Sequence, residues 1–262
     1  MKIAAIQLSV NDGGKAGRFK KLDAILSRIY AGPEKPDLIL LPELWGCGYF
    51  DFDSYAREAE ALDGETFRFL SAWALKTGAF IFGGSIIEAD GGGLFNTALF
   101  INRRGGLEAA YRKIHLFGYQ SREPLLLGRG LAPAAVETDL GVFGISTCYD
   151  LRFPEQYRAM ADMGAEIFLV AAAWPEERIE HWRLFNRARA LENQSWAVSC
   201  NCAGKHLGKR YGGFSVTVSP MGEIIAEAGA EPCVLWSEID PAAAREYRAA
   251  YPALADRVKL CK

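Results

Sequence analysis

Short apolar runs alternate with segments of helical periodicity along the whole chain, and this alternation limits the possible folds more than any other feature. Residues 2–10 (KIAAIQLSV) predict a strand, and residues 16–32 place apolar side chains along one face of a helix. The second half looks alike: residues 142–150 (VFGISTCYD) predict a strand and residues 154–165 a helix that begins with proline. Strands that alternate with helices predict stacked α/β layers.

Two glycine-punctuated segments predict antiparallel hairpins within this pattern. Residues 80–114 contain apolar runs separated by glycine-rich turns, and residues 212–229 turn at Pro220-Met221-Gly222. Hairpins combined with strand–helix alternation predict sheets that are mixed rather than wholly parallel. Because no change of composition or linker interrupts the chain, we expect one domain over residues 1–262.

Composition excludes several classes of partner. Lys plus Arg number 30 and Asp plus Glu number 32, a net charge of −2 without the basic excess of a nucleic-acid-binding protein. The first residues lack a signal-peptide pattern, and no apolar run approaches the roughly 18 residues of a membrane span. We therefore expect a cytoplasmic protein that binds neither nucleic acid nor membrane. The six cysteines form no CxxC pair and only three histidines occur, which predicts free thiols, no metal site and no cofactor.

Three segments each place a reactive side chain just after a strand-like run. They are LILLPEL with Glu43, YRKIHLF with Lys113 and GISTCYDLRFPE with Cys148. Taken singly, each residue has an ordinary structural interpretation: a solvated carboxylate at a strand end, a surface lysine and a small buried hydrophobic residue. The combination, in this order and with these neighbours, is more informative than any one residue.

The three motifs together resemble those of the nitrilase superfamily of carbon–nitrogen hydrolases, and the resemblance covers essentially the whole chain. It implies a four-layer αββα sandwich of two mixed β-sheets flanked by helices, with the Glu, Lys and Cys at the ends of the sheets. It also implies a homodimer or higher homo-oligomer, since members commonly dimerise. Glu123, in SREPLLLGRG, resembles the second glutamate of the family, which would orient Lys113 or the substrate amide.

The chemistry of amide hydrolysis accounts for these residue types. A thiol with an ordinary pKa near 8.5 needs a base to become nucleophilic at neutral pH, a role that suits Glu43 beside Cys148. Lys113 and the backbone N–H of Tyr149 would stabilise the oxyanion. Glu43 would return the proton to the departing ammonia and then activate water against the thioester.

Further segments point to a substrate. Trp174-Pro175 and RARALENQSW resemble the omega-amidase-like branch, in which the former lines the pocket. Arg152 could bind a substrate carboxylate, because guanidinium suits bidentate recognition, or it could form a salt bridge of the fold or of a dimer. Tyr49 and Phe117 could be pocket walls or core, and His115 is expected to support the site rather than act in it.

The predicted function is hydrolysis of a small carboxamide, an ω-amide of a dicarboxylate such as 2-oxoglutaramate, through a thioester and with release of ammonia. The alternatives within the superfamily are a nitrilase or another amidase, acting on deaminated glutathione or N-carbamoyl compounds. An alternative of another class is a non-catalytic binding module on the same scaffold. The absence of a G-x-S-x-G elbow disfavours a serine hydrolase, and no P-loop or Rossmann fingerprint is present.

Overall fold

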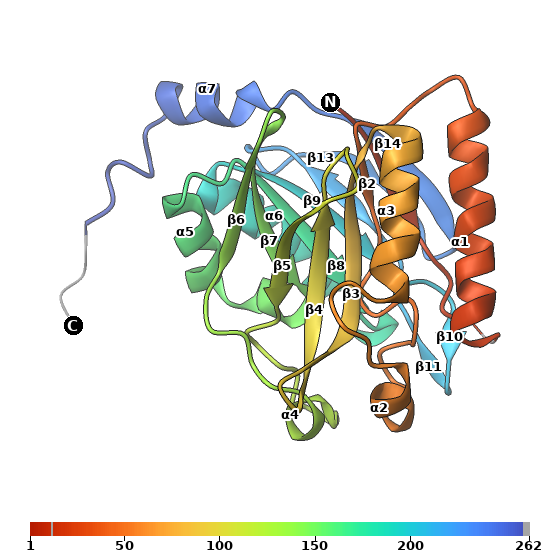
Figure 1. The fold of residues 1–262 in the computed structure, drawn as a ribbon. Coiled ribbons are helices and arrows are strands. Elements are labelled where there is room, and N and C mark those ends of the chain that lie inside the picture. The colour runs from red at the N-terminus through yellow and green to blue at the C-terminus, as the bar shows by residue number, and fades with distance from the viewer. Residues whose placement is uncertain (12, 259–262) are drawn as a thin grey trace.

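The structure, a computed structural model, describes residues 1–11 and 13–258 and consists of two six-stranded mixed sheets packed face to face. Helices cover the outer face of each sheet, so that four layers, αββα, stack in sequence (Figure 1). This confirms the predicted fold class.

The two sheets have related topologies. The first has the order β14-β1-β2-β3-β4-β5, with bounds β1 Lys2–Gln7, β2 Leu38–Leu40, β3 Phe80–Asp90, β4 Gly93–Ile101, β5 Leu107–Arg112 and β14 Cys233–Glu238. The second has the order β13-β12-β9-β8-β7-β6, with bounds β6 Ala134–Thr138, β7 Gly141–Thr147, β8 Ile167–Ala172, β9 Trp196–Asn201, β12 Val216–Val218 and β13 Ile224–Glu227. In each, three central parallel strands are flanked by antiparallel ones.

The described residues form seven α-helices, three 3₁₀ turns and one small hairpin. The helices are α1 Gly14–Ala31, α2 Tyr55–Glu58, α3 Glu65–Thr77, α4 Glu123–Leu126, α5 Pro154–Asp162, α6 Ile179–Asn193 and α7 Ala242–Ala250. The 3₁₀ turns are η1 Phe52–Ser54, η2 Cys148–Arg152 and η3 Glu176–Arg178, and the hairpin is β10 Lys205–His206 with β11 Lys209–Arg210. Within this part of the chain, no helix has both the length and the apolarity to cross a membrane.

Strand periodicity divides the apolar residues between two kinds of core. In β2, Leu38 and Leu40 point into the core between the sheets, whereas Ile39 points outward beneath α1 and α3. In β8, Leu169 likewise faces the first sheet and Phe168 packs against α5. Both faces of these central strands are thus buried, which explains why their sequences are continuous apolar runs rather than alternating ones.

The strands that precede the reactive residues all end at the same edge of the sandwich. β5 runs in the direction of β2, because two antiparallel pairings separate it from β3, which is parallel to β2. β7 and β8 are parallel neighbours in the second sheet. The carboxyl ends of strands in an open α/β sheet are where ligands usually bind.

Elements without strong periodicity were not predicted from the sequence. α4 and the β10–β11 hairpin are very short, and β6 is a half-buried edge strand that follows a proline-containing segment. The first strand also ends at Gln7 rather than at the predicted Val10. Such elements depend on partners distant in sequence, here β7 for β6.

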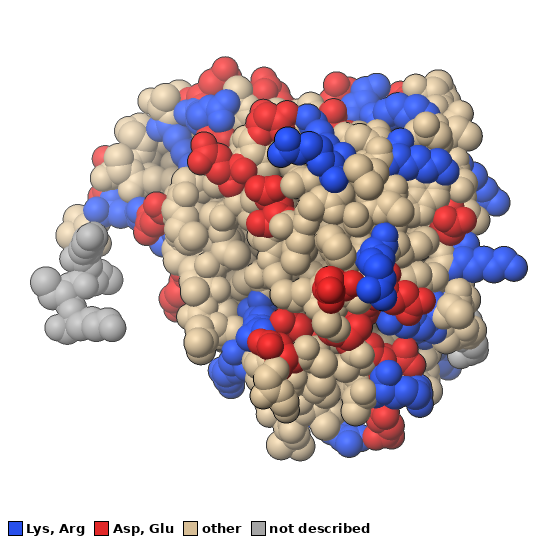
Figure 2. Space-filling view, in the orientation of Figure 1, with Lys and Arg blue, Asp and Glu red and all other residues tan. Residues whose placement is uncertain are grey.

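Charged side chains of both signs are mixed over the face seen in Figure 2. Lys and Arg lie next to Asp and Glu in its upper and lower parts, and uncharged side chains cover much of the area between them. This face therefore has no basic stripe of the kind that binds nucleic acid.

Candidate active site

Glu43 lies just beyond the end of β2, where the backbone turns sharply inward. The next residue, Leu44, has a left-handed φ of 44°. The Glu43 side chain is fully buried, and its Oε2 accepts a hydrogen bond of 2.9 Å from the backbone N–H of Ala173. Its Oε1 accepts a hydrogen bond of 2.8 Å from Asn96 Nδ2. Contacts from both sheets thus fix the orientation of this carboxylate.

Lys113 follows β5 and places its ammonium between two buried carboxylates. Its Nζ lies 2.8 Å from Glu43 Oε1 and 3.0 and 3.1 Å from the two oxygens of Glu123. Burial lowers the pKa of Lys113, but the charges of Glu123 and Glu43 oppose it and raise the pKa well above the ordinary value. The lysine is therefore a cation at neutral pH.

Glu123 begins the short helix α4, and four donor groups surround its carboxylate. In addition to Lys113, the donors are the hydroxyl of Tyr49 at 3.1 Å, the backbone N–H of Phe117 at 2.6 Å and Asn96 Nδ2 at 3.1 Å, with the Glu123 side chain fully buried. Burial nevertheless raises the pKa of Glu123, and Glu43 raises it further against the opposing effect of Lys113. The ten-residue separation from Lys113 is closed by the loop that leads to α4.

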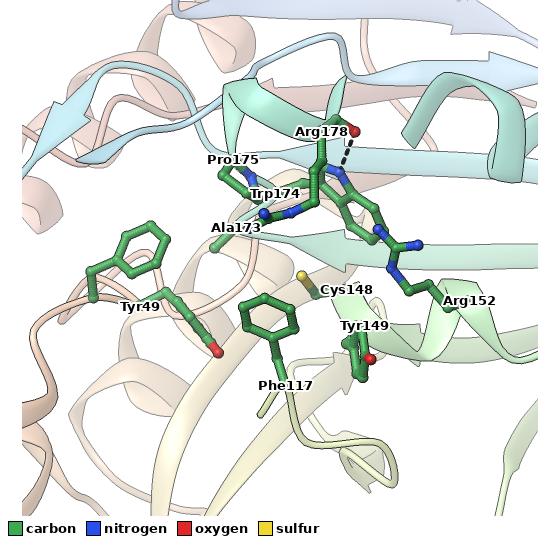
Figure 3. A pocket seen from close by; sticks show the side chains of 10 residues that line it. Tyr49, Phe117, Cys148, Tyr149, Arg152, Ala173, Trp174, Pro175 and Arg178 are labelled. Atoms are coloured by element: carbon green, nitrogen blue, oxygen red, sulfur yellow. Dashed lines mark hydrogen bonds between the residues drawn. The ribbon is translucent and has the colours of Figure 1, made fainter. Parts of the chain in front are cut away.

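Cys148 lies at the tight turn between β7 and η2. Its φ of 48° is left-handed, which is uncommon for a residue with a side chain. Figure 3 shows its sulfur in the cavity, with Phe117 and Tyr149 on one side and Trp174 on the other. Burial and the nearby Glu43 raise the pKa of the Cys148 thiol well above its usual value, whereas Lys113 lowers it. The resting group is therefore a thiol with a carboxylate close by to accept its proton.

The cavity around Cys148 has a volume of about 330 Å³, part of it open to solvent. All three predicted substrate-binding residues, Tyr149, Arg152 and Trp174, line it. Tyr49 and Phe117 also line the cavity. The structure therefore brings every residue predicted for the site to one location.

Arg152 and Arg178 border this cavity, and neither forms an ion pair with a carboxylate among the described residues. The guanidinium of Arg152 lies over the rings of Trp174 and Phe185, each at 5.1 Å, and hydrogen-bonds to His181 Nδ1 at 3.1 Å. Burial lowers the pKa of Arg152, and the charge of Arg178 lowers it further. The alternative of a salt bridge within the described part of the fold is thus wrong for Arg152.

Sequence reasoning missed two residues of the site. Asn96 is fully buried in β4, and its amide donates to both Glu43 and Glu123. An asparagine inside the apolar run LFNTALF was the available signal, since a buried amide needs partners. Arg178, in WPEER, resembled a surface charge.

The remaining cysteines are distributed through the structure. The five cysteines in the described ranges are free, four of them buried and Cys233 exposed, whereas Cys261 lies outside those ranges. Cys200 packs in the core between the sheets, and the thiol of Cys202 lies 3.5 Å from the backbone oxygen of Glu43. Residues 1–11 and 13–258 contain no group of three or more His, Cys, Asp or Glu arranged to hold a metal ion.

Comparison with known proteins identifies the family. Residues 2–249 match the carbon–nitrogen hydrolase family, and the chain belongs to it, as the resemblance to the nitrilase superfamily predicted. A 2-oxoglutaramate amidase of Paenarthrobacter nicotinovorans is 38% identical, over 98% of this chain and 89% of its own. Omega-amidase NIT3 of Saccharomyces cerevisiae is 32% identical, over 96% of this chain and 91% of its own.

A solved structure supports the same assignment. The carbon–nitrogen hydrolase superfamily protein XC1258 of Xanthomonas campestris, which carries an arsenic adduct in its active site, superposes with a TM-score of 0.91. Its sequence is 29% identical, and the match covers 100% of this chain and 98% of the other.

Proposed function

We propose that the protein is a cysteine-dependent amidohydrolase that cleaves small ω-amides of dicarboxylates such as 2-oxoglutaramate. The observation that carries the proposal is the cavity itself, which combines a thiol beside a buried carboxylate with two unneutralised guanidinium groups. The similarity to 2-oxoglutaramate amidase and omega-amidase points to the same substrates.

In the proposed reaction, Cys148 Sγ attacks the amide carbon while Glu43 takes the thiol proton. The raised pKa of the thiol requires this transfer to accompany attack, because little thiolate exists beforehand. The C–N bond then breaks as Glu43 returns the proton to the nitrogen, which releases ammonia and leaves a thioester. Water activated by the same carboxylate hydrolyses the thioester to the acid and restores the thiol.

Lys113 is proposed to stabilise the oxyanion together with the backbone N–H of Tyr149. That N–H lies in the first turn of η2, where N–H groups have no acceptor within the turn. Glu123 and Glu43 hold the ammonium by hydrogen bonds and charge, and the amide of Asn96 donates to both carboxylates. Lys113 thus remains charged and needs little rearrangement when the oxyanion forms.

Arg152 and Arg178 are proposed to bind the carboxylate at the far end of the substrate. A partly buried cation without a counter-ion is unfavourable, and a bound carboxylate would relieve this cost through charge-assisted hydrogen bonds. Trp174 and Phe117 would exclude water from the acyl chain between the two ends. A neutral amide or a nitrile would leave the arginines unpaired.

The test is an ammonia-release assay over ω-amides, amino-acid amides, N-carbamoyl compounds and nitriles. We expect 2-oxoglutaramate or succinamate to be the fastest substrates. Arg152→Ala and Arg178→Ala should each raise KM for such an amide by about 10- to 100-fold, and should change KM for neutral butyramide much less. Arg210→Ala, which removes an exposed arginine paired with Glu176, is the control. Equal effects on charged and neutral amides, or a preference for nitriles, would contradict the proposal.

We also propose that the protein forms a homodimer through the outer face of α6. Leu184 and Leu191 are seven residues apart on this helix and are 64% and 51% exposed, and Gly222, beside the 54% exposed Met221, packs against Leu191. A second copy of α6 packed on this face would remove these side chains from water. Light scattering should give twice the mass of one chain, and Leu184→Glu should yield monomers; a monomeric wild type would contradict the proposal.

We also propose that the protein is located in the cytoplasm. The described cysteines are all free, and thiols remain reduced in that compartment.

A further inference from the structure

We propose that Asp150 is a positioning residue that holds the Cys148 turn against the Lys113 segment, an inference that rests on the proposed function. Asp150 lies two residues after Cys148 and is fully buried. Its carboxylate touches neither the sulfur nor the ammonium through any hydrogen bond found in the structure. It instead accepts hydrogen bonds from the two segments that carry them.

Each carboxylate oxygen of Asp150 accepts two hydrogen bonds, and Oδ2 accepts one from each segment. Asp150 Oδ2 accepts from the backbone N–H of Thr147 at 3.0 Å and from the hydroxyl of Tyr111 at 2.7 Å. Oδ1 accepts from the backbone N–H of His115 at 2.9 Å and from His115 Nδ1 at 2.8 Å. Thr147 precedes the nucleophile in the second sheet, and Tyr111 and His115 flank Lys113 at the end of the first. A single carboxylate therefore joins the two sheets at the reacting groups.

The Thr147 bond also supports an unfavourable backbone conformation. Cys148, with its φ of 48°, lies between the two bonded residues. A left-handed conformation is strained for a residue with a side chain and persists only where the surroundings determine it. The bond across the turn is such a constraint, and it keeps the Cys148 sulfur directed into the cavity.

The donors around Asp150 are themselves held in place. The Tyr111 hydroxyl accepts from the backbone N–H of Ile114 at 3.2 Å and from Gln156 Nε2 at 2.8 Å, so its own proton is directed at Asp150. Burial and the charge of Asp150 raise the pKa of Tyr111 well above its usual value, which keeps that proton in place. The His115 ring stacks on Phe153 at 3.7 Å.

His115 Nδ1 faces two acceptors, Asp150 Oδ1 and Gln156 Oε1, the latter at 3.1 Å. This nitrogen therefore carries a proton. An ionised carboxylate only accepts hydrogen bonds and can satisfy all four donors around Asp150, whereas an asparagine amide has one accepting oxygen and would direct N–H groups at other N–H groups. Asp150→Asn keeps the size of the side chain and disrupts its bonding.

The test compares Asp150→Asn with wild type in two assays. The first is steady-state hydrolysis of the preferred amide, and the second is the burst of p-nitrophenol when p-nitrophenyl acetate acylates Cys148. The burst needs the nucleophile and the oxyanion donors but no amide specificity, and its amplitude counts correctly folded sites. Because misplacement by about 1 Å can cost about 100-fold in rate, we expect kcat and the burst rate constant to fall by roughly that factor, with KM changed less than about twofold.

Glu166→Gln is the matched control. Glu166 is a buried carboxylate at the other end of the second sheet, paired with Arg245 at 2.7 and 2.9 Å. The Glu166→Gln substitution should lower the melting temperature of the protein without changing the burst rate constant. If Asp150→Asn does not fold, Tyr111→Phe removes one of the four donors and should lower the burst rate constant about tenfold, the equivalent of one hydrogen bond.

The outcomes separate this inference from the proposed function. A wild-type burst that slows in Asp150→Asn or Tyr111→Phe, with no ammonia from any amide, would contradict the proposed function and support the positioning role. An unchanged burst rate constant per site in either folded variant would overturn the positioning role, even with full amide turnover in the wild type. Loss of burst amplitude alone, at an unchanged rate constant, would assign Asp150 to folding and also overturn it.

Discussion

Replacing Lys113 by glutamine tests how one buried cation serves both stability and the proposed reaction. The substitution removes the ammonium that lies 2.8 Å from Glu43 and 3.0 Å from Glu123. Two fully buried carboxylates then remain, bridged by the amide of Asn96. The loss of one partner from a buried ion pair costs about 3–5 kcal/mol of unfolding free energy, because it leaves uncompensated charge. This cost is not reduced by solvent screening, because the side chains of Lys113, Glu43 and Glu123 are all fully buried.

The catalytic effect has a separate origin and a separate size. Loss of one oxyanion donor lowers kcat by about 10²–10³-fold. The two effects can be separated with the double variant Lys113→Gln/Glu123→Gln, which removes one of the stranded carboxylates. We expect this variant to regain most of the lost unfolding free energy but none of the lost kcat.

Urea unfolding would measure the unfolding free energy of each variant. Ammonia release, normalised to the number of sites titrated by the p-nitrophenol burst, would measure kcat. Glu166→Gln again controls for a buried carboxylate pair remote from the cavity. Recovery of kcat in the double variant would refute the reasoning, because it would mean that Lys113 acts only by neutralising Glu123. A single variant with near wild-type kcat would refute it as well.

Three further predictions follow from the same geometry. Iodoacetamide should inactivate the enzyme in step with labelling of Cys148, and Cys148→Ala should abolish turnover; modification of the exposed Cys233 should leave activity intact, and inactivation that tracks Cys233 would contradict the assignment. Because the raised pKa of Glu123 makes the folded state hold this proton to higher pH than the unfolded state, its contribution to stability falls as pH rises above about 4.5. Urea unfolding should therefore show that the unfolding free energy of the wild type falls relative to that of Glu123→Gln between acid and neutral pH. A rise over the same range would contradict the raised pKa of Glu123. Dialysis against EDTA should leave kcat unchanged, and a loss restored by one divalent metal would show that the reaction needs more than the residues named here.

The predicted helices and strands match the structure where the pattern of neighbouring residues is enough to specify them. The spacing of apolar residues in α1, α3, α5 and α6 and the continuous apolar runs of β2 and β8 follow from periodicity and burial. The short helix α4 and the edge strand β6 have little periodicity of their own, so nothing local marks them. The interpretation of residues 1–262 as one domain stays a prediction.

The candidate site divides in the same way. Glu43, Lys113 and Cys148 could be selected from the sequence because each ends a strand-like run within a motif of the family. Arg178 could not, because an arginine in a loop has no distinctive local pattern. The position of Asn96 within an apolar run indicates a buried amide but does not show which groups it binds. Their relevance arises only from what they face, the two carboxylates for Asn96 and the cavity for Arg178.

Periodicity in the sequence predicted α/β layers with mixed sheets, and the motifs of the family implied the four-layer order and the proposed reacting side chains, because such patterns are properties of neighbouring residues. The electrostatics of the site arises only when the chain is folded. The charge state of Lys113 depends on two carboxylates 10 and 70 residues away, and the raised pKa of Cys148 depends on burial and on Glu43. Such shifts come from distance and desolvation in space, which the linear order of residues does not contain.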